Sequence, residues 1–105
     1  MLKMGFTDTV VLSAATPVTR TYEINAATNW VIVIHNTGIN DLTSLSIARS
    51  PLGGIYESAT SVTTGIPLVT LTKLVIEGNN EPVRYLQVTY TSTLGTTISV
   101  EGSGN

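Results

Sequence analysis

The sequence predicts an all-β fold: a single β-sandwich of about seven antiparallel strands, of immunoglobulin-like or jelly-roll type. Of its 105 residues, 38 are β-branched (18 Thr, 11 Val and 9 Ile), and such side chains fit a pleated sheet better than a helix. Apolar and polar residues alternate along most of the chain, which is the pattern of a strand with one buried face. Clusters of Gly, Pro and Asn interrupt the alternation, as expected of the turns that join short strands in a sandwich.

The first half of the chain is expected to form four strands, at about 7–13, 18–25, 29–35 and 42–49. The polar run from Asn36 to Asp41 predicts the turn between the last two. The strand at 29–35 is apolar on both faces, because Val31 and Val33 alternate with Trp30, Ile32 and Ile34. One face of each sheet in an antiparallel sandwich normally meets water. We therefore expect the two valines to be covered by the N-terminal segment, by a loop or by another subunit.

The second half is expected to form three strands, at about 67–77, 83–92 and 96–102, with a tight hairpin at Leu94-Gly95 between the last two. Within 67–77 the apolar face changes sides after Leu71. One extra residue near Thr72-Lys73 would restore a single apolar face, so we predict a β-bulge there. Helical spacing of Leu68, Leu71, Thr72 and Val75 is the alternative, but β-branched residues favour the strand.

A chain of this length makes one domain, which we place at 1–105 with a short N-terminal arm (1–6) and a flexible C-terminal tail (102–105). Its start lacks the 7–15-residue apolar stretch of a signal peptide, and no apolar run approaches the ~20 residues of a membrane helix. We therefore expect no signal peptide and no membrane partner. A net charge of −2 also argues against nucleic acid, which calls for clustered Lys and Arg.

Few residues are suited to chemistry. The chain has no Cys and a single His, His35, so it holds no disulfide and no thiolate metal site. It has no Gly-x-Ser-x-Gly motif to expose a nucleophile, and Asn79-Asn80-Glu81 is too poor in carboxylates for a calcium site. We expect neither an enzyme nor a cofactor or metal. Carbohydrate binding stays an alternative, because Tyr56 and Tyr85 are expected to be exposed, although two scattered rings make a weak platform.

The scarcity of charge is the most informative feature of the composition. Only 12 residues are charged, or 11%, against roughly 25% in soluble domains, and Arg20 and Lys73 fall inside strands where they conflict with the core pattern. The outside must therefore consist largely of Thr and Ser, which are easily desolvated. Such a surface suits packing against copies of the chain or a larger lattice. The candidate interface residues are Leu2, Met4, Phe6, Val31, Val33, Leu52, Ile55 and Tyr56.

Two stretches carry a family resemblance. The stretch from Trp30 to Gly38, followed by Leu42–Ile47, and the stretch Val83–Tyr90, followed by Thr96–Gly102, resemble hairpins of small tailed-phage virion proteins of the capsid decoration (cement) type. The resemblance implies a β-sandwich that forms a homo-oligomer, often a trimer, and clamps neighbouring copies of a major capsid protein. It also implies location in the virion after synthesis in the host cytoplasm. Similar hairpins occur in bacterial surface-filament subunits and adhesive modules. The alternative functions are a carbohydrate- or cell-surface-binding module, or a subunit of a fibre, tail tip or bacterial surface filament.

Overall fold

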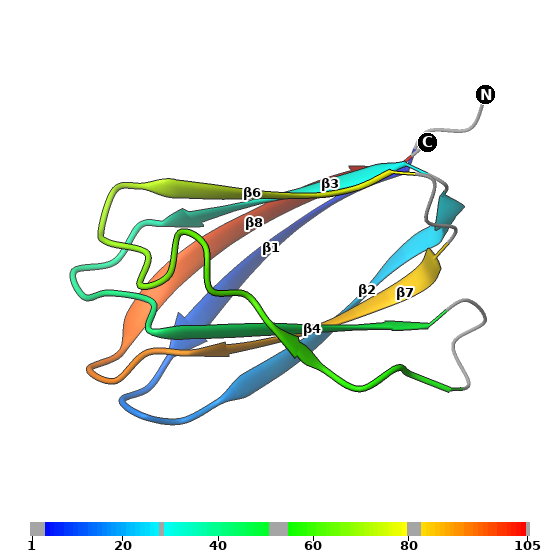
Figure 1. The fold of residues 1–105 in the computed structure, drawn as a ribbon. Helices are drawn as coiled ribbons and strands as arrows, with labels where there is room; N and C mark the ends of the chain where they lie inside the picture. Colours follow the sequence, from blue (N-terminus) through cyan, green and yellow to red (C-terminus); the bar gives the residue numbers. More distant parts are fainter. Residues whose placement is uncertain (1–3, 28, 51–54, 80–82, 105) are drawn as a thin grey trace.

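The computed structural model confirms the predicted class: eight strands form two antiparallel sheets that pack as a sandwich (Figure 1). The structure describes residues 4–27, 29–50, 55–79 and 83–104. Within these ranges, no helix is long and apolar enough to cross a membrane. The first sheet has the order β1 (Met4–Leu12), β8 (Thr96–Gly104), β3 (Trp30–Asn36) and β6 (Lys73–Gly78). The second has the order β2 (Val18–Ala27), β7 (Val83–Thr91), β4 (Ser44–Ser50) and β5 (Thr60–Ser61).

The core lies between the two sheets and uses the inward positions that the alternation predicts. Ile32 and Ile34 of β3 are fully buried, as are Leu86 and Val88 of β7. Each such aliphatic side chain contributes roughly 1.5–3 kcal/mol through its removal from water. Other apolar residues of the strands that face the interior are also buried: Tyr22, Ile24, Trp30, Leu45, Ile47, Tyr90, Ile98 and Val100.

The β-bulge predicted near Thr72-Lys73 was wrong, because the chain changes sheets at this point. Leu68 exchanges two backbone hydrogen bonds with Leu42, at 3.0 and 2.9 Å, beside the second sheet. The chain then turns through Leu71, whose φ is 63°, and β6 pairs with β3 in the first sheet. Leu68 belongs to the buried core, whereas Leu74 of β6 is partly buried and packs against that core. The two residues reach the core from different segments, so the apolar face changes sides between them. The two-residue strand β5 was also missed, since Thr60 and Ser61 carry no apolar alternation.

Part of the predicted arm (1–6) and tail (102–105) lies within strands. Residues 4–6 and 102–104 belong to β1 and β8 and pair with each other, from Met4 opposite Gly104 to Phe6 opposite Gly102. The Phe6 ring lies over Gly102, where a Cβ would come within 2.2 Å of two ring carbons. The backbone pairing and this ring packing hold the ends of the chain in the sheet. Residues 1–3 and 105 lie outside the described residues.

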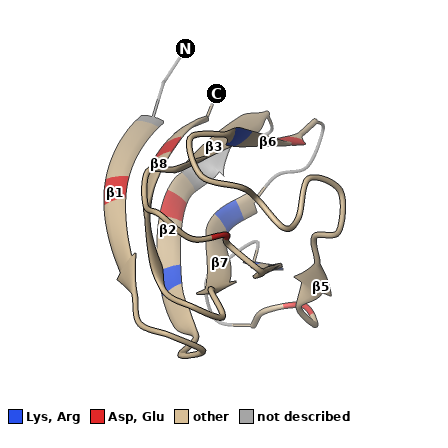
Figure 2. Ribbon diagram, turned by 90° about the vertical axis from the view of Figure 1, so that its left-hand side faces the viewer, with Lys and Arg blue, Asp and Glu red and all other residues tan. Residues whose placement is uncertain are grey.

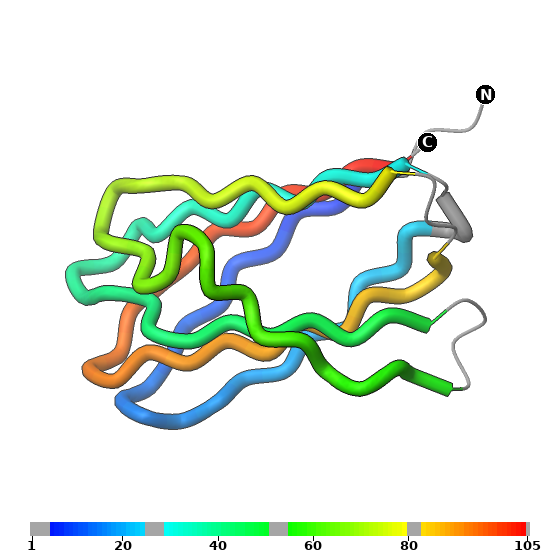
Figure 3. The backbone as a smooth tube through the Cα atoms, viewed as in Figure 1, coloured from blue at the N-terminus to red at the C-terminus, as the bar shows by residue number. Residues whose placement is uncertain are grey.

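The two ends of the sandwich differ in what they carry. Both termini lie at one end (Figure 1). The turns β1–β2, β3–β4 and β7–β8, together with the turn that precedes β6, gather at the opposite end (Figure 3). Segments far apart in the sequence therefore form one surface at this opposite end.

Candidate functional site

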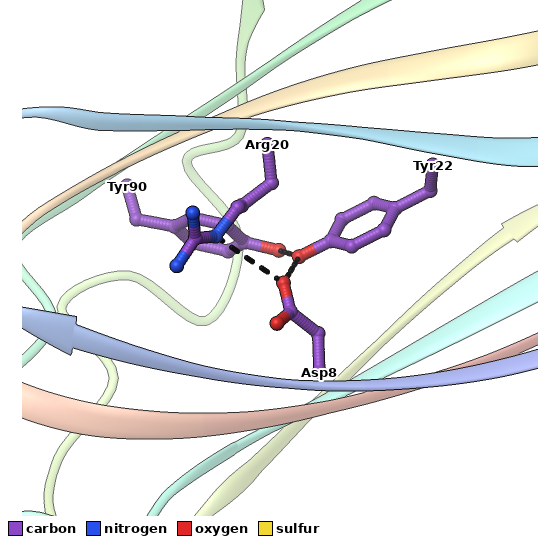
Figure 4. A network of polar contacts seen from close by, with 4 residues as sticks. All are labelled: Asp8, Arg20, Tyr22 and Tyr90. Carbon is purple, nitrogen blue, oxygen red and sulfur yellow. Dashed lines mark hydrogen bonds and ion pairs between the residues drawn. The ribbon is translucent and has the colours of Figure 1, made fainter.

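A polar network joins the two sheets on the side where β1 lies near β2. It consists of Asp8 from β1, Arg20 and Tyr22 from β2, and Tyr90 from β7 (Figure 4). The Tyr22 hydroxyl donates to Asp8 Oδ2 at 2.9 Å and lies 2.9 Å from the Tyr90 hydroxyl. Because a phenol carries one proton and Tyr22 gives its own to Asp8, Tyr90 must donate to Tyr22. Arg20 Nε lies 3.4 Å from Asp8 Oδ2. This ion pair explains why an Arg occupies an inward-facing position on β2, at the open edge between β2 and β1.

Both tyrosines of the network are held in the neutral form. Burial raises the pKa of Tyr22 well above its usual value, and the Tyr90 hydroxyl and the Asp8 carboxylate raise it further. Burial also raises the pKa of Tyr90. The ring of Phe6 stacks on Tyr22 with centroids 4.5 Å apart and planes 11° apart. At neutral pH the two phenols therefore stay protonated, and their hydrogen bonds join the two sheets.

His35 lies on the outer face of the first sheet. Its partners across the neighbouring strands are Lys73 of β6 and Ser99 of β8, so no carboxylate faces it directly on either side. Among the described residues, no three or more His, Cys, Asp and Glu side chains group closely enough to hold a metal ion. The surroundings of His35 therefore do not suggest a catalytic arrangement.

The outer faces of the two sheets differ in chemistry. That of the second sheet is mainly hydroxylic, as in the pair Thr19 and Thr89, whose Oγ1 atoms lie 3.0 Å apart. The first sheet instead presents Val31 and Val33, both partly buried, and Val75, which pairs with Val33 and is 52% exposed. We call this the valine face: Val31, Val33 and Val75, flanked on β6 by Lys73 and Glu77. Phe6, one of the expected covers, lies between the sheets and therefore does not cover this face.

A second apolar surface lies at the end of the sandwich away from the termini. Of seven large hydrophobic side chains that are exposed in the described part of the chain, five lie in or next to the turns at this end. We call this surface the loop end, and its residues are Val11, Ile39, Val69, Leu71 and Leu94. Ile39 and Leu94, which are 89% and 71% exposed, together line two shallow hollows of about 600 and 370 Å³. Figure 2 shows how few charged residues interrupt the chain.

The structure does not bring the predicted interface residues together. Val31 and Val33 lie on the valine face, whereas Phe6 packs inside against Tyr22. Ile55 is 84% exposed in the segment after β4, where Tyr56 is partly buried. Leu2, Leu52 and the side chain of Met4 lie outside the described residues. The loop end was missed, although large apolar residues within polar turns, as in Asn36–Asp41, are a signal that the sequence contains.

A further pocket lies at the terminal end. Its volume is about 410 Å³, and it is lined by Asn29, Trp30, Val31, Glu77, Asn79, Ser103 and Gly104. Trp30 is 5% exposed, and its indole N–H meets no acceptor among the described residues. Tyr85, the expected sugar-binding ring, lies elsewhere, on β7, with the Arg84 guanidinium carbon 5.6 Å from its centroid. Among the residues that the structure describes, neither place combines the charged groups that acid–base chemistry requires.

Comparisons with known proteins relate the chain to others by fold alone. No protein-family model matches the sequence, and no curated protein sequence matches it. Among solved structures, it is similar to the Yersinia pseudotuberculosis-derived mitogen, with 13% identity and a TM-score of 0.58 over 99% of this chain and 88% of that one. It is similar to the SPBc2 prophage-derived protein YomS (9%, 0.53, over 99% and 95%) and to the decameric BFDV capsid protein (6%, 0.53, over 98% and 95%). These likenesses show that the chain shares a β-sandwich fold with these proteins.

Proposed function

We propose that this chain is a structural virion protein that decorates and stabilises the head of a tailed phage, binding the major capsid protein and copies of itself. The observation that carries the proposal is the loop end, where five large apolar side chains project into solvent. Exposed apolar residues gathered in one place mark interaction surfaces. A chain with so few charges loses little hydration when such a surface is covered.

The size of the loop end fits a contact with a preformed lattice. Full burial of one Val, Leu or Ile side chain contributes roughly 1.5–3 kcal/mol, so five exceed the lower estimates of ~4–15 kcal/mol for the cost of association. The position fits too, since the loop end lies opposite the termini and leaves both sheets free for neighbouring copies. The likenesses to a prophage-derived protein and to a capsid protein support this class, as does the sequence resemblance to decoration proteins.

Binding to capsids tests the proposal. Heads of the phage that encodes the chain, stripped of it or assembled without it, are mixed with purified protein and sedimented. We expect the wild type to sediment with the heads, and Ile39→Glu combined with Leu94→Glu to bind at least about tenfold more weakly. The matched control is Ile55→Glu, because Ile55 is 84% exposed but lies away from the loop end, and it should bind as the wild type does.

Two outcomes contradict the proposal. One is wild-type protein that stays in the supernatant at every concentration. The other is a doubly substituted loop end that binds heads normally. A glycan array tests the main alternative: strong binding of one glycan that is lost on Tyr85→Ala or Tyr56→Ala would favour a carbohydrate-binding module instead.

A further inference from the structure

We propose that the valine face is a self-association surface, on which a second copy of the chain docks face to face about a two-fold axis. The proposed function includes binding between copies of the chain, and the valine face is the surface that we assign to this binding. The proposal rests on the proposed function in this respect only. It is carried by a different observation from the loop end, namely the order of charges and valines on β6 and β3.

The register of the first sheet arranges the outer face in rows. Val75 of β6 lies directly across from Val33 of β3. Two residues along β6 on either side of Val75 are Lys73 and Glu77, both exposed. Since positions two apart in a strand point to the same face, β6 presents a positive charge, a valine and a negative charge in line.

This order is complementary to itself. A two-fold axis that runs across the strands at Val75 and lies between the two sheets reverses the strand direction in the second copy. It places Lys73 of each copy over Glu77 of the other, and Val75 and Val33 over their own counterparts. An isologous contact of this kind uses the same residues on both partners, so each favourable pair occurs twice. The valines would form the centre, and the two ion pairs would lie at the rim, because β6 is the edge strand.

Pairing through the edge of β6 would satisfy the same charges, but neighbouring chain stands in the way. The segment between β5 and β6 packs beneath this edge, where a Cβ on Gly65 would lie 2.7 Å from Leu74 Cδ1. Figure 2 shows this segment looping out to the side of β6. The outer face of β3 and β6 is free of this obstacle. Aligned sheets pack about 10 Å apart at roughly 30° to one another, a spacing that valines fill.

Glu101 provides an internal check on this geometry. It lies on β8 across from Val33, in the same row as the proposed axis. In the face-to-face arrangement Glu101 therefore approaches its own counterpart, and like charges disfavour the contact. The two acidic residues of this face are thus expected to act in opposite directions: Glu77 favours association and Glu101 opposes it.

Sedimentation equilibrium over a wide concentration range tests the proposal. The contact is small, so we expect a weak monomer–dimer equilibrium in the wild type. Lys73→Glu alone and Glu77→Lys alone should each weaken it about tenfold or more, since each puts two like-charge contacts into the dimer. The combined exchange Lys73→Glu with Glu77→Lys restores opposite charges and should recover the dimer. Glu101→Gln should leave it unchanged or tighten it.

Two further variants separate the possible contacts. Val33→Lys places a cation opposite Glu101 within one copy, so the fold should tolerate it, but it sets two like charges at the dimer axis and should abolish association. Ile55→Glu is the matched control, because Ile55 is 84% exposed and belongs to neither the valine face nor the loop end. The dimer dissociation constant of this control variant should equal that of the wild type. Circular dichroism confirms that each variant is folded.

Several results would overturn the proposal. These are a monomer at all concentrations, a trimer as the stable species, a dimer that survives Val33→Lys, or a double charge exchange that fails to restore association. None of them bears on the binding of capsids through the loop end. A failure of capsid binding, conversely, leaves the dimer equilibrium as measured, so the two proposals fail separately.

Discussion

The hydrogen bonds between Tyr22, Tyr90 and Asp8 lead to an asymmetric prediction. Tyr90→Phe removes one hydroxyl that donates to Tyr22, and Tyr22 keeps its bond to the Asp8 carboxylate. The loss is one hydrogen bond, or about 1 kcal/mol of unfolding free energy. Tyr22→Phe removes both bonds and leaves the Tyr90 hydroxyl, whose residue is 0% exposed, without its acceptor. A lost bond to a charged group and a stranded buried donor together cost about 3 kcal/mol.

Urea unfolding followed by the fluorescence of Trp30 measures the difference, since this is the single Trp and it is buried. With a slope of roughly 1–3 kcal/mol per molar urea, Tyr22→Phe should lower the midpoint by about 1 M or more, and Tyr90→Phe by about a third as much. The double variant should be no less stable than Tyr22→Phe alone, because it removes the stranded donor. Tyr85→Phe is the control. Equal losses for the two single variants would refute the assigned direction of the hydrogen bonds.

Two more predictions concern stability. Asn36→Ala should lower the unfolding free energy by roughly 4 kcal/mol, measured by thermal or urea unfolding. The side-chain amide of Asn36 is fully buried, and it forms hydrogen bonds with Asn40 O, Leu68 O, Gly38 N and Thr96 Oγ1. A loss of less than about 0.5 kcal/mol would contradict this prediction. Above pH 10, the usual tyrosine pKa, unfolded tyrosines ionise while Tyr22 and Tyr90 stay protonated in the fold. The unfolded state then binds fewer protons, so the unfolding free energy should fall by up to about 1.4 kcal/mol per pH unit for each of the two, and less steeply in Tyr90→Phe.

The two proposed surfaces assign different roles to different parts of a chain with few charges. The loop end is nearly uncharged and suits a contact whose register is set by the partner. The valine face holds charges of both signs in a fixed order, which is the means by which an apolar contact acquires a defined orientation. Of the residues singled out in the sequence, Val31 and Val33 remain interface candidates. Phe6 contributes to the interior, because its strand extends further toward the N-terminus than the alternation showed.

The sequence alone determined most of the strands and the side chains that face inward along them. Trp30, Ile32 and Ile34 are buried as predicted, and so are Leu86, Val88 and Tyr90. This information is local, because alternation with period two follows from backbone geometry within one strand. The charge deficit is also a property of the composition, and together with the placement of the strands it predicts sheet faces that are easily desolvated.

Only the tertiary structure decided how the strands pair and what the exceptions to the pattern mean. The β1–β8–β3–β6 order joins strands from opposite ends of the chain, and no local signal specifies such pairs. The apolar face changes sides near Leu71 because the chain passes from one sheet to the other there. Arg20 faces inward because it pairs with Asp8 at the open edge between β1 and β2. Asn36 forms hydrogen bonds that join its own segment to two others distant in sequence. In each case the deciding contacts join residues far apart in the chain, and these contacts exist only once the sheets have packed.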